Sequence, residues 1–102
     1  FAAYEELLGD PEIEAVSVWA ANHAHAEMSV AALKAGKHVL CEKPMAVTLE
    51  ECEAMVAAAK ESGKYLMIGQ NQRLAKAHAK AKELIEQGAI GKAAFLAEGA
   101  VQ

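Results

Sequence analysis

The sequence lacks an excess of positive charge, a long apolar run and any stretch that reads as a signal peptide. Its 14 acidic and 10 basic residues give a formal net charge of -4, so neither nucleic acid nor an anionic membrane surface is expected as a partner. No apolar run reaches the length that a membrane-spanning helix needs. What remains is 102 residues, 54% hydrophobic and rich in alanine. This composition argues against disorder and predicts one small folded core.

Cysteine is also scarce. The two thiols, Cys41 and Cys52, fall in a predicted strand and a predicted helix, without the spacing of metal ligands. We therefore expect two reduced structural thiols, no metal site and a cytoplasmic location, where thiols stay reduced.

Glycine recurs at a fixed interval. Gly9, Gly36 and Gly63 are 27 residues apart, and each follows a helix-like segment and precedes a short apolar one. An interval of this length fits one strand, one helix and two short loops. The pattern predicts the α/β class, with a parallel sheet whose strands are joined by crossover helices. The apolar segments are predicted strands covered on both faces, at residues 14–20, 38–42 and 65–69.

Helical patterns separate these strands. Thr48 and Glu51 have the spacing of a capping box, which predicts that a helix begins there. The other predicted helices span residues 4–8, 24–35 and 74–87. The helix that follows Thr48 is expected to bury one stripe of side chains, made of Cys52, Met55, Val56 and Ala59.

The pattern changes near the end of the sequence. Gly91 is followed by a looser alternation over residues 93–102, which predicts a strand of a separate mixed or antiparallel sheet. We therefore predict a domain boundary near residue 90. Residues 1–90 would belong to the parallel-sheet domain, and residues 91–102 would begin a substrate or oligomerisation domain.

Polar residues follow the predicted strands. Ligands of open parallel sheets bind beyond the carboxyl ends of the strands, and right-handed crossovers place those ends side by side. The residues expected to line one crevice there are Asn22, His25, Lys43, Asn71 and Arg73.

Each of these residues has a simpler alternative. Asn22 suits a helix N-cap, and His25 suits a partly satisfied surface histidine. Lys43 could do no more than pair with Glu42, and Arg73 could be a solvated loop residue. Taken singly, none of them identifies a site.

Several motifs occur in a fixed order. The sequence has asparagine-x-x-histidine at 22–25, AGKHVLCEKP at 35–44, VT at 47–48, GQNQR at 69–73 and IEQGAIGK at 85–92. This ordered set, which runs over nearly the whole chain, resembles the Gfo/Idh/MocA oxidoreductases, such as glucose-fructose oxidoreductase and inositol dehydrogenase. One departure is Ala21, which stands where the family usually has proline before the asparagine.

The resemblance implies a dehydrogenase or reductase that uses NAD or NADP and acts on a sugar, cyclitol or related polyol. It implies that Lys43 is the catalytic residue, which orients the substrate hydroxyl and stabilises the negative charge that develops there. The Lys43–Pro44 bond is expected to be cis, since it lies in a turn that faces the ligand. We also expect a homo-oligomer. The cofactor-binding residues implied by the resemblance are Asn22, His25, Glu42, Lys43, Pro44 and Arg73.

The sequence contains no G-x-G-x-x-G, the turn that binds the pyrophosphate in a Rossmann domain. We therefore expect the second half of such a domain, inactive alone and completed by the rest of its own chain. One side of the strand at 14–20 would be bare. Two alternatives remain, an inactive fragment and a stand-alone α/β module for binding or oligomerisation.

Overall fold

The computed structural model of the chain describes residues 3–95. The chain divides into two compact units between Gln70 and Asn71. The predicted domain boundary near residue 90 stays a prediction. No described helix is long and apolar enough to cross a membrane.

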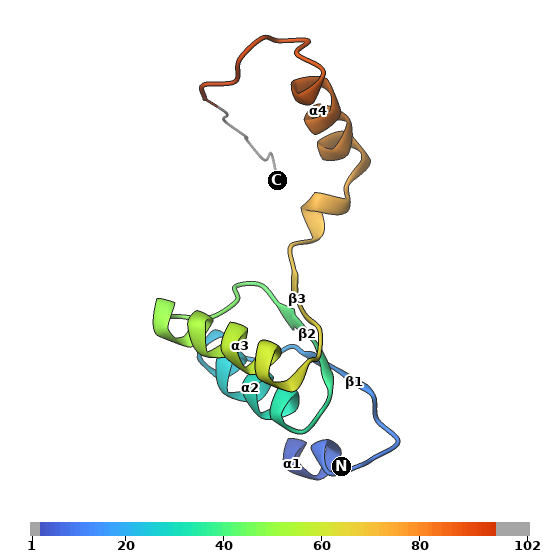
Figure 1. Ribbon diagram of the computed structural model, residues 1–102, viewed down its shortest axis with the longest axis vertical. Helices are drawn as coiled ribbons and strands as arrows, with labels where there is room; N and C mark the ends of the chain where they lie inside the picture. Colours follow the sequence, from blue (N-terminus) through green and yellow to red (C-terminus); the bar gives the residue numbers. More distant parts are fainter. Residues whose placement is uncertain (1–2, 96–102) are drawn as a thin grey trace. The chain divides into compact units, whose positions relative to one another are not determined.

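The first unit is a three-stranded parallel sheet with crossover helices, as predicted (Figure 1). The strands are adjacent in the order β1-β2-β3. Among the described residues β1 pairs with β2 alone, so its other side is bare, as expected. The elements of this unit are α1 (Tyr4–Leu8), β1 (Ala15–Val18), η1 (Asn22–Ala24), α2 (His25–Lys34), β2 (His38–Glu42), α3 (Leu49–Ser62) and β3 (Leu66–Gly69).

The two long helices of this unit, α2 and α3, lie side by side on one face of the sheet (Figure 1). Residues in parallel register point to the same side of a sheet, so Leu40 and Met67 share the opposite face. These two side chains are 44% and 57% exposed. The prediction that the strands are covered on both faces is therefore not met among the described residues. The buried core consists of Val18, Ala26, Ala32, Leu33, Val39, Cys41, Met55 and Ala58.

Helix α3 begins with the predicted capping box. The Thr48 hydroxyl accepts a hydrogen bond from the Glu51 backbone N–H at 3.2 Å, and the Glu51 carboxylate accepts one from the Thr48 N–H at 3.3 Å. The predicted buried stripe is only partly correct, because Met55 is buried while Val56 is 43% exposed. Ala58 is buried instead, so the helix turns the Met55 and Ala58 face toward the core.

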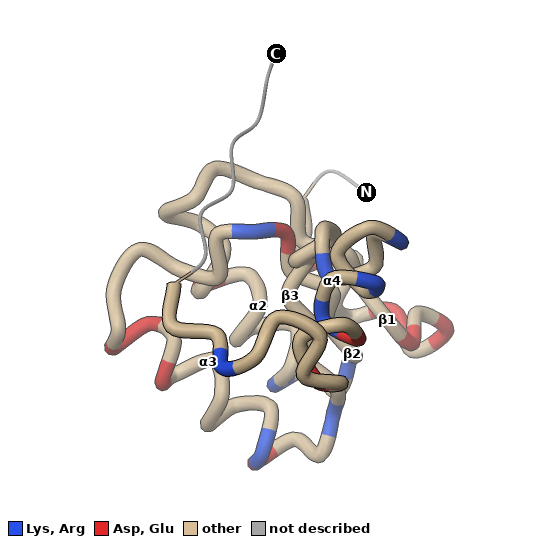
Figure 2. Tube along the Cα trace, turned by 90° about the horizontal axis from the view of Figure 1, so that it is seen from above, with Lys and Arg blue, Asp and Glu red and all other residues tan. Residues whose placement is uncertain are grey.

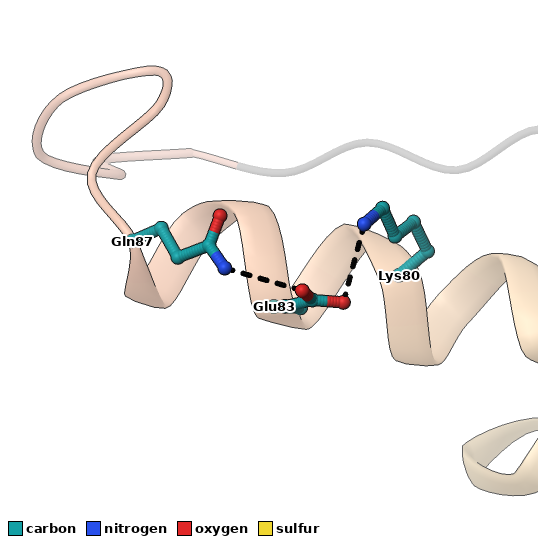
Figure 3. A network of polar contacts seen from close by, with 3 residues as sticks. All are labelled: Lys80, Glu83 and Gln87. Carbon is teal, nitrogen blue, oxygen red and sulfur yellow. Dashed lines mark hydrogen bonds and ion pairs between the residues drawn. The ribbon is translucent and has the colours of Figure 1, made fainter.

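The second unit contains η2 (Asn71–Leu74) and α4 (Lys76–Glu86), which agree with the predicted helix. Polar contacts run along one side of α4. The Glu83 carboxylate accepts hydrogen bonds from Lys80 at 3.3 Å and from Gln87 at 3.1 Å (Figure 3). No strand occurs at residues 93–95. The rest of the strand predicted at 93–102 lies outside the described residues.

Candidate functional site

The carboxyl ends of the three strands meet at one edge of the sheet. Val18 pairs with Cys41 near the ends of β1 and β2, and Glu42 pairs with Gly69 at the ends of β2 and β3. Because neighbouring parallel strands end together, the loops that follow them are adjacent. This is the edge at which open α/β sheets bind their ligands. Among Asp, Glu, Lys and Arg in the described chain, every charged residue before Lys34 is acidic, and both signs occur from Lys34 onward (Figure 2).

Lys43 lies at this edge in the loop that follows β2. Its side chain is exposed, and among the described residues it has no recorded hydrogen bond or ion pair. The alternative that it merely pairs with Glu42 is therefore not observed. The Lys43–Pro44 bond is cis, as expected. The ammonium is available to donate hydrogen bonds to a ligand.

Glu42 lies across the end of the neighbouring strand. A Cβ atom on Gly69 would be 2.7 Å from Glu42 Oε2 and 3.3 Å from Glu42 Cδ. Only glycine leaves this space, so the carboxylate lies over the Gly69 backbone. No hydrogen bond to the Glu42 carboxylate is recorded among the described residues. Sequence reasoning did not assign a role to Gly69, because its register opposite Glu42 is known only from the structure.

His25 is buried beneath the two loops. It is 1% exposed, so the alternative of a surface histidine is wrong. Its ring atom Nδ1 is 2.7 Å from the Pro44 carbonyl oxygen, and Nε2 is 3.0 Å from the Ala20 carbonyl oxygen. One ring therefore connects the loop after β1 to the loop after β2.

Asn22 is exposed in η1, directly after the loop that leaves β1. Its side chain makes no capping hydrogen bond, and the residue before α2 is Ala24. The N-cap alternative is therefore wrong, and the Asn22 amide is free to contact a ligand. Ala21 has a φ of -62°, which is the angle that a proline would impose there. The departure from the family pattern at this position thus leaves the local backbone unchanged.

Asn71 and Arg73 both lie in η2 of the second unit and are exposed. Their proximity to Lys43 stays a prediction.

Cys41 lies below the turn that carries Lys43. It is fully buried, and burial raises the pKa of its thiol above the ordinary value of 9.0. The polar Ser29 hydroxyl nearby lowers the pKa of the thiol and so opposes this shift, and the nearby Glu42 carboxylate adds to it. A protonated buried thiol is a poor nucleophile, so Cys41 supports the turn rather than reacting. Cys41 and Cys52 are both free.

No three His, Cys, Asp or Glu side chains among the described residues are grouped so that they could hold a metal ion. The polar groups that the edge does present are an amide, a carboxylate and an ammonium, on Asn22, Glu42 and Lys43. Such groups hydrogen-bond to hydroxyl and carboxamide groups. The edge therefore suits a ligand rich in hydroxyl groups.

Comparison with known proteins agrees with this geometry. Residues 1–70 match the model of the Gfo/Idh/MocA group, which is described as an oxidoreductase family with an NAD-binding Rossmann fold. The chain belongs to this family. The predicted α/β fold with a parallel Rossmann-type sheet is thus confirmed, while the predicted separate sheet that follows it stays a prediction.

Three curated Gfo/Idh/MocA relatives are similar to most of the chain. A 1,5-anhydro-D-fructose reductase of Ensifer adhaerens is 49% identical over 88 residues, which are 86% of this chain and 26% of the relative. A levoglucosan dehydrogenase of Pseudarthrobacter phenanthrenivorans is 45% identical, over 87% of this chain and 23% of the relative. An inositol 2-dehydrogenase of Salmonella typhimurium is 41% identical, over 87% and 27%. The chain therefore spans about a quarter of the length of these relatives.

Solved structures give the same result. A levoglucosan dehydrogenase in complex with NADH and levoglucosan has a TM-score of 0.84 and 43% identity, over 90% of this chain and 25% of that one. A probable dehydrogenase from Thermotoga maritima has a TM-score of 0.84 and 37% identity, over 90% and 28%. The fold of this Gfo/Idh/MocA chain is thus shared with enzymes of known structure.

Proposed function

We propose that this chain is part of an NAD(P)-dependent oxidoreductase that transfers a hydride between nicotinamide and a sugar, cyclitol or related polyol. One observation carries the proposal: the exposed Lys43 ammonium, which has no recorded partner among residues 3–95, lies at the carboxyl edge of a parallel Rossmann-type sheet. The relatives named above support the substrate class, since their names refer to sugars and inositols.

Lys43 is the catalytic residue in this proposal. The nicotinamide ring, when bound, supplies the position that accepts or gives the hydride. The Lys43 ammonium donates a hydrogen bond to the reacting oxygen of the polyol and holds it in place. As negative charge develops on that oxygen, the compact ammonium stabilises it.

The other proposed residues bind the cofactor. In this proposal the Asn22 amide and the Glu42 carboxylate hydrogen-bond to its ribose hydroxyls or carboxamide. Pro44 shapes the turn on which Lys43 stands. Arg73 remains a proposed cofactor-binding residue, and His25 is proposed to support the two loops from within the first unit.

We further propose that the parent protein works in the cytoplasm as a homo-oligomer, with no nucleic acid or membrane as a partner. The two free thiols agree with a reducing compartment. The apolar side chains Leu40 and Met67 on the bare face of the sheet need cover. The rest of the protein's own chain, or a second copy in the homo-oligomer, would supply it.

The test uses the full-length protein with NAD or NADP and a panel of inositols and anhydrosugars. Wild-type protein should reduce the cofactor, and Lys43→Ala should lower kcat by about tenfold or more while circular dichroism stays unchanged. Lys34→Ala is the matched control, because Lys34 is exposed on α2 away from the loops. Unchanged turnover in Lys43→Ala would remove the catalytic role of Lys43. Absence of any nicotinamide reduction by wild type would refute the function.

A further inference from the structure

The ring of His25 contacts two loops, the one after β1 and the one after β2, and each loop carries or leads into a proposed ligand-binding residue. We call this pair of contacts the tie. The Pro44 carbonyl that it contacts belongs to the residue directly after Lys43, and the Ala20 carbonyl lies two residues before Asn22. The ring nitrogens are 2.7 Å and 3.0 Å from these oxygens. Any change in either contact would move a loop relative to the other.

Both partners of the ring are carbonyl oxygens, which carry no proton. Every proton in these contacts therefore comes from His25, and both contacts are hydrogen bonds at the same time only when both ring nitrogens carry a proton. At 1% exposure the ring is closed off from solvent, so water cannot readily replace it. With both nitrogens already used by the backbone, the ring has no polar atom left for a ligand.

The same turn has one further side-chain contact from below. Cys41 Sγ is 3.4 Å from the Glu42 carbonyl oxygen and 3.9 Å from that of Met45. A thiol is a weak donor, and these distances are long. The hydrogen bond from His25 is thus the stronger restraint on the turn that carries Lys43.

We propose that His25 is a positioning residue, which holds the Lys43 turn and the Asn22 turn at a fixed separation through their backbones. It acts on the reaction through Lys43 and does not touch the substrate or the cofactor. The proposal rests on the proposed function of Lys43. In this proposal His25 supports the two loops and does not bind the cofactor directly, which differs from the role that the resemblance implied.

A double-mutant cycle in the full-length enzyme tests the coupling. His25→Gln should lower kcat by about tenfold, and in a Lys43→Ala background the same change should have an effect of less than about twofold. A merely structural role would lower kcat by the same factor in both backgrounds and would overturn the proposal. His23→Gln is the matched control, because His23 is exposed in the short helix η1, which directly precedes α2 and His25, and it has no recorded contact among the described residues.

Hydrogen exchange of the full-length protein tests the tie without any activity. Exchange at residues 21–24 and 45–47 should be faster by about tenfold in His25→Gln and unchanged in His23→Gln. If His25→Gln does not fold, the ring protons of the wild-type protein serve instead, and NMR should show coupling from a ring N–H to the Pro44 carbonyl or to the Ala20 carbonyl. Unchanged exchange or absent coupling would overturn the tie. If the wild-type protein shows no turnover, the proposed function is refuted but the tie is not. Hydrogen exchange and NMR coupling test the tie without any activity.

Discussion

Replacing Gly69 by alanine would separate the stability of the sheet from the position of the Glu42 carboxylate. The φ of Gly69 is not in the left-handed region, so its backbone accepts a side chain. The new Cβ would lie 2.7 Å from Glu42 Oε2 but 3.5 Å from Glu42 Cα. Only the far end of the Glu42 side chain is too close, and it can turn away toward solvent.

The stability change should therefore be small. Moving Glu42 to a less favourable side-chain conformation costs about 0.5–1.5 kcal/mol. Alanine in place of glycine restricts the unfolded chain and returns about 0.4–1 kcal/mol. The two terms offset each other to within about 1 kcal/mol. The cofactor would lose a charge-assisted hydrogen bond worth about 1.5–3 kcal/mol, which weakens its binding by about tenfold or more.

Calorimetry and NADH titration of the full-length protein measure both quantities. Gly69→Ala should shift Tm by no more than about 4 °C while the Kd for NADH rises. Glu42→Ala should weaken binding similarly, and the double variant should bind no more weakly than either. Wild-type affinity in Gly69→Ala would refute the role of the Glu42 carboxylate. A fall in Tm of more than about 8 °C would refute the claim that only a flexible side chain moves.

Two further predictions concern the sheet unit. Thr48→Ala should lower the free energy of unfolding in urea by about 1 kcal/mol, because it removes half of the capping box. Thr48→Ser is the control and should lower this free energy much less. Equal losses of free energy in the two variants would contradict the argument. Since burial raises the pKa of the Cys41 thiol, the unfolded thiol ionises first as pH rises. The stability that this thiol contributes is complete below its ordinary pKa of 9.0 and is lost above it. Urea unfolding from pH 8 to 10.5 should show a steeper loss in wild type than in Cys41→Ala, and parallel curves would exclude this linkage.

The sequence was sufficient to predict the order and direction of the strands. The glycine interval marks each return from helix to strand, and the pairing of Thr48 with Glu51 marks where α3 begins. These are local signals, because each depends on residues a few positions apart. The position of Lys43 at the carboxyl edge followed directly from the parallel order.

The parts that were missed depend on contacts between segments far apart in the chain. The burial of Ala58 in place of Val56 depends on how α3 turns against α2. The space above Gly69 is visible only once its register with Glu42 is known. For His25, the partners are main-chain oxygens at positions 20 and 44, which no side-chain pattern records.

Because His25 contacts main-chain oxygens, the tie places little demand on the identity of its partners. Every residue type has a carbonyl group, so a substitution at position 20 leaves the acceptor in place wherever the backbone path is kept. A substitution at position 25 removes both contacts at once. The side chain at position 25 is therefore the one whose identity these two contacts require. A loop side chain at position 20 can therefore change without removing the acceptor that His25 contacts.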